Sequence, residues 1–98
     1  MIVAFSISPS TADETGGVSE AVAAAVRVVR SSGLPNETNA MFTNIEGEWD
    51  EVMAVVKAAV EAVAAVSPRV SLVLKADIRA GYDGQLAAKV QRVEERLA

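Results

Sequence analysis

The sequence predicts an α+β fold, because two kinds of hydrophobic periodicity alternate along its 98 residues. Residues 1–8 and 69–77 alternate apolar with polar side chains, which is typical of strands with one buried face. Residues 19–33 and 49–66 instead repeat valines and alanines at intervals of three and four, which is typical of amphipathic helices. Together these segments predict a sheet that packs against a layer of helices.

The first strand and the first helix are separated by residues 9–17, a loop by its Gly, Ser and Thr content. The strand directs three apolar side chains to one face: Val3, Phe5 and Ile7. We expect Ser19 to cap the helix, because a side-chain oxygen there accepts a hydrogen bond from the first turn. Gly33 and Pro35 are expected to end it.

Residues 36–47 are too short and too polar for a buried helix. We expect two short strands there, meeting in a tight turn near Met41 and Phe42. The helix of residues 49–66 follows and ends at a Ser-Pro pair.

The last strand, residues 69–77, presents four inward side chains: Val70, Leu72, Leu74 and Ala76. A C-terminal helix, capped by Asp83, carries an apolar stripe of Leu86, Val90, Val93 and Leu97. The order βαββαβ plus a helix predicts a ferredoxin-like sandwich, with an antiparallel sheet in spatial order 4-1-3-2 and two helices on one face. The expected core comprises Val3, Phe5, Ile7, Val22, Val26, Ile45, Val56, Val60, Leu72 and Leu74.

The composition limits the chemistry that the chain can perform. It has neither Cys nor His, which excludes disulfides, thiolate zinc sites and Ser-His or Cys-His catalysis. The formal charge of −4 opposes nucleic-acid binding, which needs a basic surface. No apolar run approaches the roughly 20 residues that span a bilayer, and the start lacks a basic signal-peptide region. We expect a single cytoplasmic domain over residues 1–98.

Two motifs could suggest an ion site, but each has a simpler structural interpretation. Residues 46–51 are rich in carboxylates, which could bind Mg²⁺ or Ca²⁺, yet their spacing fits no known metal loop. We interpret them as charges that complement the N-terminus of the following helix. Gly16 and Gly17 precede the first helix, whose amides could hold an anion, but two glycines alone indicate a flexible loop. No metal site is predicted.

Polar residues on the two short strands suggest a ligand pocket. Alternation places Thr43 and Ile45 on the core face of one strand, with Asn39 and Met41 on the same side of the other. A buried Asn is costly unless its amide is hydrogen bonded. Either Asn39 lies near a strand end and meets water or backbone, or it and Thr43 hydrogen-bond a ligand between sheet and helices. The apolar walls would then be Phe5, Met41 and Ile45.

The opposite face of the sheet mixes polar and apolar side chains, with Phe42 and Val73 as its bulkiest apolar members. Such a face either stays in water or packs against another subunit, and the second interpretation is favoured because sheet faces usually find a partner layer. Three residues on this face are second-rank ligand candidates: Ser6, Ser8 and Glu46.

Three segments of the chain resemble the thiamine-binding protein family: Met1 to Pro9, Met41 to Val52, and Arg69-Val70 with the later Lys75, Asp77 and Arg79. The most specific piece is Thr43-x-Ile45-Glu46-Gly47-Glu48 before the helix that begins at Trp49. The resemblance covers essentially the whole chain. It implies a small ferredoxin-like protein that forms homodimers or tetramers and binds thiamine, or its hydroxymethylpyrimidine part, without catalysis or a cofactor.

The implied ligand agrees with the residues of the predicted pocket. An aminopyrimidine needs a hydrogen-bond donor and an acceptor, which Asn39 and Thr43 can supply, while residues 9–17 could form a lid. Two other classes stay open: a regulatory or assembly module without thiamine affinity, and a cofactor-free enzyme. The sequence does not distinguish salvage, transport and sensing.

Overall fold

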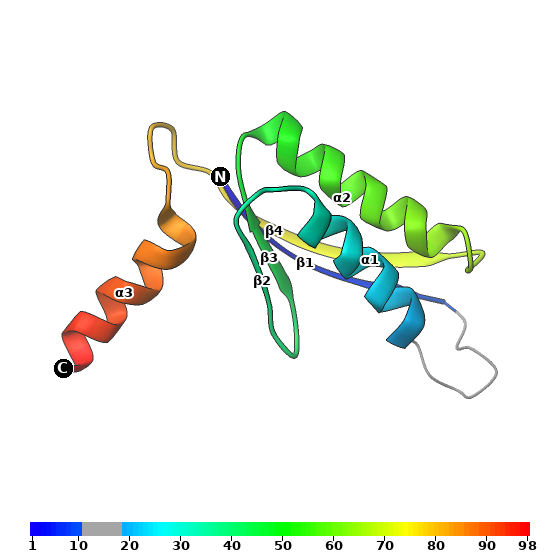
Figure 1. Cartoon of the computed structure of the whole chain (residues 1–98), viewed down its shortest axis with the longest axis horizontal. Helices are drawn as coiled ribbons and strands as arrows, with labels where there is room; N and C mark the ends of the chain where they lie inside the picture. Colours follow the sequence, from blue (N-terminus) through cyan, green and yellow to red (C-terminus); the bar gives the residue numbers. More distant parts are fainter. Residues whose placement is uncertain (11–18) are drawn as a thin grey trace.

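The computed structural model describes residues 1–10 and 19–98 and has the predicted α+β architecture (Figure 1). Its elements are β1 (Ile2–Pro9), α1 (Ser19–Ser31), β2 (Asn36–Thr38), β3 (Thr43–Glu46), α2 (Trp49–Ala64), β4 (Val70–Asp77) and α3 (Gln85–Leu97). The four strands form one antiparallel sheet in the order β2-β3-β1-β4, which confirms the predicted topology. Most of the predicted lid, both glycines before α1 and the Ser19 side chain lie outside the described residues.

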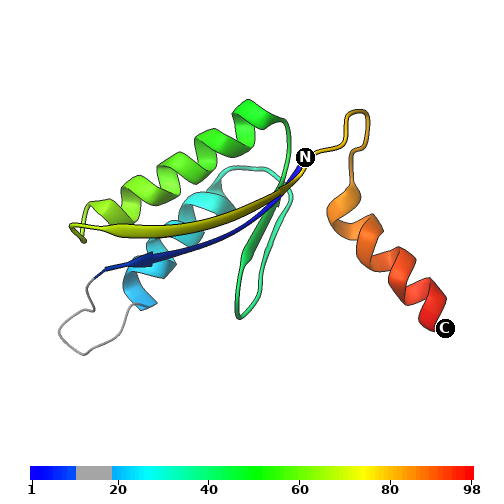
Figure 2. The same cartoon turned by 180° about the vertical axis from the view of Figure 1, so that it is seen from behind.

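The hydrophobic core lies between the inner face of the sheet and the two helices α1 and α2, which cover that face side by side (Figures 1 and 2). Its buried members are Val3, Phe5, Ile7, Ala25, Val29, Ile45, Val52, Val56, Ala59 and Val63. Small side chains on α1 and α2 allow both helices to approach the sheet closely. Each exchange of a buried valine for alanine would therefore leave a small cavity in this layer.

The predicted core was wrong at Leu72, which is 41% exposed. Leu72 pairs with the buried Ile7 and points to the same face, but β4 is an edge strand, so Leu72 has a neighbouring strand on one side only. Four other predicted core residues are half-buried: Val22, Val26, Val60 and Leu74. Alternation therefore predicts the direction of a side chain, whereas its burial depends on what lies above it.

The connection between β2 and β3 corrects the predicted placement of Asn39 and Met41. Residues 39–42 form the turn itself, and the Asn39 carboxamide oxygen accepts hydrogen bonds from the backbone N–H groups of Met41 and Phe42, each 2.9 Å long. This is the local turn-forming geometry that Asn favours. Asn39 is consequently exposed and does not point under the helices, and Met41 is 73% exposed.

Acidic residues of the 46–51 segment bind the N-termini of helices, as predicted, but they serve two helices and not only α2. Before α2, the backbone N–H of Glu48 donates to Glu51 Oε1 at 3.1 Å, which is one half of a capping box. Before α3, the expected Asp83 cap is wrong: the residue at the helix boundary is Gly84, whose φ of 65° lies in the left-handed region. The acceptor for the first turn of α3 comes instead from Glu46 on β3.

Helix α3 stands apart from the α1–α2 layer and diverges from the rest of the molecule (Figures 1 and 2). It touches the body chiefly at β3. All of α3 lies in the described part of the chain, and none of its side chains is buried. No helix among the described residues is both long and apolar enough to span a membrane.

Candidate functional site

A pocket opens beside β1 where the strand loses one of its two neighbours. Strand β4 pairs with β1 from Ile2 to Pro9, whereas β3 pairs only from Ile2 to Phe5. The β2–β3 turn lies beside the unpaired stretch, and α1 covers it. The resulting pocket measures about 180 Å³ and is lined by Phe5, Ser6, Ile7, Val22, Ala25, Val26 and residues 38–43. We call it the hairpin-tip pocket.

The walls of the hairpin-tip pocket combine apolar surface with hydrogen-bonding groups. Phe5, Ile7 and the valines of α1 provide the apolar part. Thr43 is buried and contributes a hydroxyl that can donate or accept. The Asn39 carboxamide oxygen already accepts two hydrogen bonds in the turn, so Asn39 would bind a ligand through its Nδ2 donors.

The backbone of β1 supplies further polar groups to the same pocket. In a strand, successive N–H and C=O pairs point alternately to the two sides. Beyond Phe5, the described sheet has β4 on one side of β1 and no strand on the other. Around Ser6 and Ile7, backbone groups that face this side are therefore not engaged by the sheet, and a planar ligand with donors and acceptors along one edge could pair with them.

The structure brings together only part of the predicted site. Phe5, Ser6, Asn39, Met41 and Thr43 all line the hairpin-tip pocket. Ile45 does not line this pocket, and its side chain packs in the core instead. Ser8 lies farther along β1, on the exposed outer face opposite Ser71. Glu46 lies at the other end of β3 in a different pocket.

Sequence reasoning missed Ile7, Val22, Val26 and the unpaired edge of β1. The unpaired edge could have been predicted from the different lengths of the neighbouring strands. The alternation at the N-terminus continues through Ser8, whereas the segment between the predicted helices has room only for two short strands. A long strand beside a short one leaves backbone groups without a strand partner.

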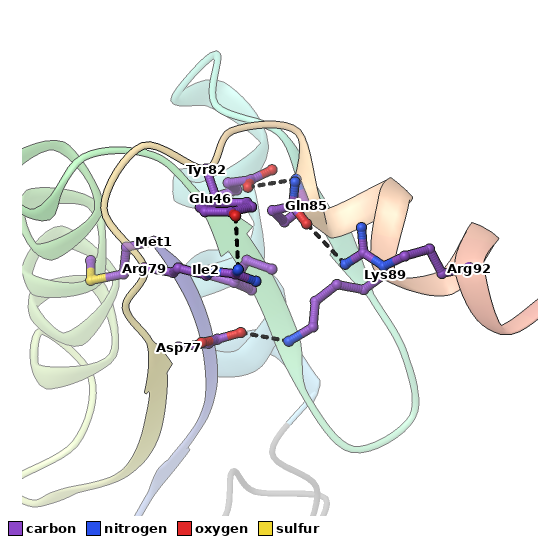
Figure 3. Close-up of a pocket in the computed structure, with 9 residues that line it drawn as sticks. All are labelled: Met1, Ile2, Glu46, Asp77, Arg79, Tyr82, Gln85, Lys89 and Arg92. Atoms are coloured by element: carbon purple, nitrogen blue, oxygen red, sulfur yellow. Dashed lines mark hydrogen bonds and ion pairs between the residues drawn. The ribbon is translucent and has the colours of Figure 1, made fainter.

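A second pocket, which we call the α3-base pocket, lies where α3 begins and is lined by five charged side chains (Figure 3). Glu46 is only 5% exposed, and both of its carboxylate oxygens face the first turn of α3. Oε2 accepts the Gln85 backbone N–H at 2.8 Å, and Oε1 accepts the Leu86 N–H at 3.2 Å. Because the first N–H groups of a helix have no partner within it, Glu46 satisfies the N-terminus of α3 from a distant strand.

The other charged side chains around Glu46 are also engaged with one another (Figure 3). Asp77 forms an ion pair with Lys89, and this hydrogen bond and charge hold the pKa of the Asp77 carboxyl below its ordinary value. The Arg79 guanidinium lies 3.6 Å from the centre of the Tyr82 ring and donates to its hydroxyl at 2.8 Å. The α3-base pocket measures about 110 Å³, and the side chains that line it fix the position of α3.

Neither pocket has the composition of a metal site. Within residues 1–10 and 19–98, no three carboxylates converge closely enough to hold a metal ion. Glu46 faces α3, whereas Glu51 faces the N-terminus of α2, so the acidic segment is divided between two helices. This geometry supports the interpretation of the segment as helix-terminal charge.

These features define a class: a small ferredoxin-like domain with a compact, mostly apolar pocket at one end of its sheet. The chain belongs to the thiamine-binding protein family, whose sequence profile matches residues 3–94. It is 57% identical to a UPF0045 protein of Mycobacterium bovis, over 99% of this chain and 94% of that protein.

Two solved structures are similar in both sequence and fold. A hypothetical protein of Methanocaldococcus jannascii has a TM-score of 0.84 and 32% identity, and the match covers 96% of this chain and 95% of that one. A Thermotoga maritima protein, provisionally assigned to thiamine biosynthesis or salvage, has a TM-score of 0.76 and 25% identity, with 93% and 97% covered. The family membership thus extends over nearly the whole chain.

Proposed function

We propose that this protein binds thiamine, or its hydroxymethylpyrimidine part, without covalent bonding and without transforming it. The observation that carries this proposal is the hairpin-tip pocket, where apolar walls surround the Thr43 hydroxyl, the Asn39 amide and the unpaired edge of β1. Membership of the thiamine-binding protein family supports the same ligand. Its role in salvage, transport or sensing would follow from the binding of this ligand.

The size of the pocket favours one ring of the ligand. Pockets that enclose a drug-sized molecule measure about 300–1,000 Å³. At about 180 Å³, the hairpin-tip pocket is smaller and fits a single substituted pyrimidine better than both rings of thiamine. The aminopyrimidine would lie between Phe5 and the valines of α1, with its amino group directed to Thr43. The positively charged thiazolium would remain outside, where the net charge of −4 favours it.

The chemistry of the pocket supports binding without catalysis. Among the described residues that line it, none has an ionisable acid or base side chain. General acid–base catalysis needs such a group within hydrogen-bonding reach of the reacting atoms. A hydroxyl, an amide and backbone groups can recognise a pyrimidine, but they do not move protons efficiently near neutral pH. We therefore propose a binding protein and not a cofactor-free enzyme.

Calorimetric titration tests this function. The protein is titrated with thiamine, hydroxymethylpyrimidine and oxythiamine, in which a carbonyl replaces the pyrimidine amino group. We expect the first two to bind and oxythiamine to bind at least about tenfold more weakly, since a mismatched polar edge leaves a buried group unpaired. The absence of binding of either amino-pyrimidine at millimolar concentration would contradict the proposal.

We further propose that the protein is a homo-oligomer, a dimer or a tetramer. The outer face of the sheet carries no covering layer among the described residues, and it exposes Val73, an apolar side chain that a partner subunit would bury. The same open face favours the second candidate function, an assembly module, which would keep its oligomeric state and lack affinity for thiamine. The cytoplasmic location stays a prediction from the sequence.

A further inference from the structure

The backbone groups of β1 face two different strands, and the hydrogen bonds near its ends show which residues face which strand. The Ser10 N–H donates to the Arg69 carbonyl at 2.9 Å, in register with the pairing of β1 and β4. The Gly47 N–H donates to the Met1 carbonyl at 3.1 Å, in register with the pairing of β1 and β3. Successive residues of an antiparallel strand point their N–H and C=O groups to opposite sides. Even-numbered residues of β1 therefore bond to β4, and odd-numbered residues face β3.

Ile7 is an odd-numbered residue for which β3 supplies no partner. The pairing of β1 with β3 ends at Phe5 and Thr43, and its continuation would place Met41 opposite Ile7. Met41 belongs to the turn instead, where its N–H donates to Asn39 Oδ1 at 2.9 Å. The Ile7 N–H and C=O therefore face the hairpin-tip pocket, which Ile7 lines, and neither has a hydrogen-bond partner among the described residues.

The Ile7 N–H belongs to a residue that is largely shielded from water. Ile7 is only 8% exposed, so few water molecules can reach its backbone. Buried N–H groups are nearly always hydrogen bonded, because an unpaired one gives up its bonds to water and gains nothing in return. A ligand in the hairpin-tip pocket would supply the missing acceptor.

The Ile7 N–H differs from the Thr43 hydroxyl because it can only donate. A hydroxyl donates or accepts, so Thr43 can pair equally with an amino group or with a carbonyl oxygen. A backbone N–H pairs with a ring nitrogen that carries a lone pair, and it opposes a ring nitrogen that carries a hydrogen. The Asn39 Nδ2 group also only donates, but Asn39 is exposed, so water can pair with a mismatched group there.

We infer that the Ile7 backbone determines which pyrimidines the pocket accepts, an inference that rests on the proposed function and extends it. The Ile7 N–H donates to the ring nitrogen next to the amino group, while the amino group itself reaches the Thr43 hydroxyl. In a 4-oxo pyrimidine this nitrogen carries a hydrogen, so two donors would face each other and the buried N–H would stay unpaired. The ligand thus takes the position opposite Ile7 that β3 leaves empty.

The Ile7 carbonyl adds a second condition for the ligand. It follows the N–H along β1, away from Thr43, and therefore faces the ring carbon on the other side of the same nitrogen. Because a carbonyl only accepts, this carbon must not carry another acceptor. The methyl group of hydroxymethylpyrimidine satisfies the condition, whereas the carbonyl oxygen of cytosine does not. The pocket should therefore reject cytosine although cytosine has both the amino group and the acceptor nitrogen.

The test is calorimetric titration with hydroxymethylpyrimidine, with its 4-oxo analogue and with cytosine. It compares the parent with a protein in which in vitro translation replaces Ile7 by the corresponding α-hydroxy acid. The resulting ester keeps the side chain and removes only the N–H. The same replacement at Ser8 is the matched control, because the Ser8 N–H faces β4 and Ser8 does not line the pocket.

We expect the parent to bind hydroxymethylpyrimidine at least about tenfold more tightly than the 4-oxo analogue or cytosine. The Ile7 ester should reduce the preference over the 4-oxo analogue to about threefold or less, because the amino ligand loses a hydrogen bond and the oxo ligand no longer faces a donor. The Ser8 ester should keep the parent preference. Thr43→Val should also keep it, while weakening both ligands.

Hydrogen exchange provides a second measurement that needs no variant. In the free protein the Ile7 amide should exchange faster than the amides of Ser6 and Ser8, which bond to β4, and saturating hydroxymethylpyrimidine should slow it. If this ligand binds but leaves the Ile7 amide unprotected, or if the Ile7 ester keeps the parent preference, the role of Ile7 is wrong and the proposed function stands. Cytosine that binds as tightly as hydroxymethylpyrimidine would contradict the role of the carbonyl. If no aminopyrimidine binds, the inference and the proposed function are both wrong.

Discussion

The two ends of strand β3 differ in how their polar groups are used. At the Thr43 end, a hydroxyl, an amide and the edge of β1 surround a pocket without ionisable side chains among its described residues. At the Glu46 end, charged side chains are numerous, but Glu46, Asp77 and Arg79 each have a partner within the protein (Figure 3). The charged residues of the α3-base pocket therefore hold α3 in place. The hairpin-tip pocket, whose neutral polar groups are available to a ligand, is the candidate site.

The largest expected effect comes from the core beside the Thr43 end of β3. Phe5 is buried, pairs with Thr43 and lines the hairpin-tip pocket. Phe5→Ala should lower the free energy of unfolding by about 3–5 kcal/mol, as large-to-small core substitutions do, and should abolish binding. Denaturant unfolding measures the first effect. Val66→Ala, at an exposed position just after α2, is the control and should change stability by about 0.5 kcal/mol or less; equal losses would contradict the assigned core.

The next prediction distinguishes the helix contact of Glu46 from the ligand site in the hairpin-tip pocket. Glu46→Ala removes the acceptor for two N–H groups of α3 and should lower the free energy of unfolding by about 0.5–2 kcal/mol, the range for lost helix caps. Circular dichroism should show a loss of helix, while the affinity for hydroxymethylpyrimidine stays within about twofold of the parent. A loss of affinity as large as that of the pocket variants would remove the distinction between the two ends of β3.

At the other end, Thr43→Val should weaken ligand binding by about threefold to tenfold, which is the cost of one neutral hydrogen bond. Because Thr43→Ser retains a hydroxyl, it should keep most of the affinity. Calorimetry on both variants measures this difference. Parent-like affinity in Thr43→Val would show that the hydroxyl does not contact the ligand.

Asn39 allows a finer test, because its amide has two roles. Asn39→Asp keeps an oxygen that accepts from Met41 and Phe42 but replaces the Nδ2 donors with a second acceptor. It should preserve stability and reduce ligand affinity by about threefold to tenfold, whereas Asn39→Ala should reduce both. An Asn39→Asp protein with parent-like affinity would leave Asn39 with only its role in the turn.

The smallest effect concerns Asp77, whose pKa is lowered first by the hydrogen bond from Lys89 and then by its charge. Since the folded state depresses this pKa, the contribution to stability is present above the unfolded pKa and is lost as pH falls through the folded pKa. Lys89→Ala should raise the pKa of Asp77 toward its ordinary value, as measured by NMR titration of the carboxyl. An unchanged pKa would show that the ion pair is not formed in solution.

The fold was predictable from the sequence because its signals are local. Alternation in residues 1–8 and 69–77 and the helical repeats of the valines and alanines predict the long strands and the helices. The strand order then follows because βαββαβ is the element order of the ferredoxin-like sandwich. Burial was less predictable, as Leu72 shows, because it depends on which helix lies above an edge strand.

The candidate site was predictable only in part. Phe5 and Thr43 were placed near one another by alternation, and they do line one pocket. Met41 lines the same pocket, but from the exposed turn and not from the strand face that alternation predicted. Asn39 was misplaced because the sequence does not reveal whether its amide bonds to its own turn or points inward. The role of Glu46 was hidden because its partners, Gln85 and Leu86, lie about 40 residues later in the chain.

The most direct test of the central claim is an NMR titration of the ¹⁵N-labelled protein with hydroxymethylpyrimidine. If the ligand binds at the hairpin tip, the backbone amides of Ser6, Ile7 and Thr43 should shift progressively and saturate, while those of Gln85 and Leu86 at the base of α3 stay in place. Shifts confined to Gln85 and Leu86, or no shift at any amide at millimolar ligand, would contradict the assignment of the hairpin-tip pocket as the binding site.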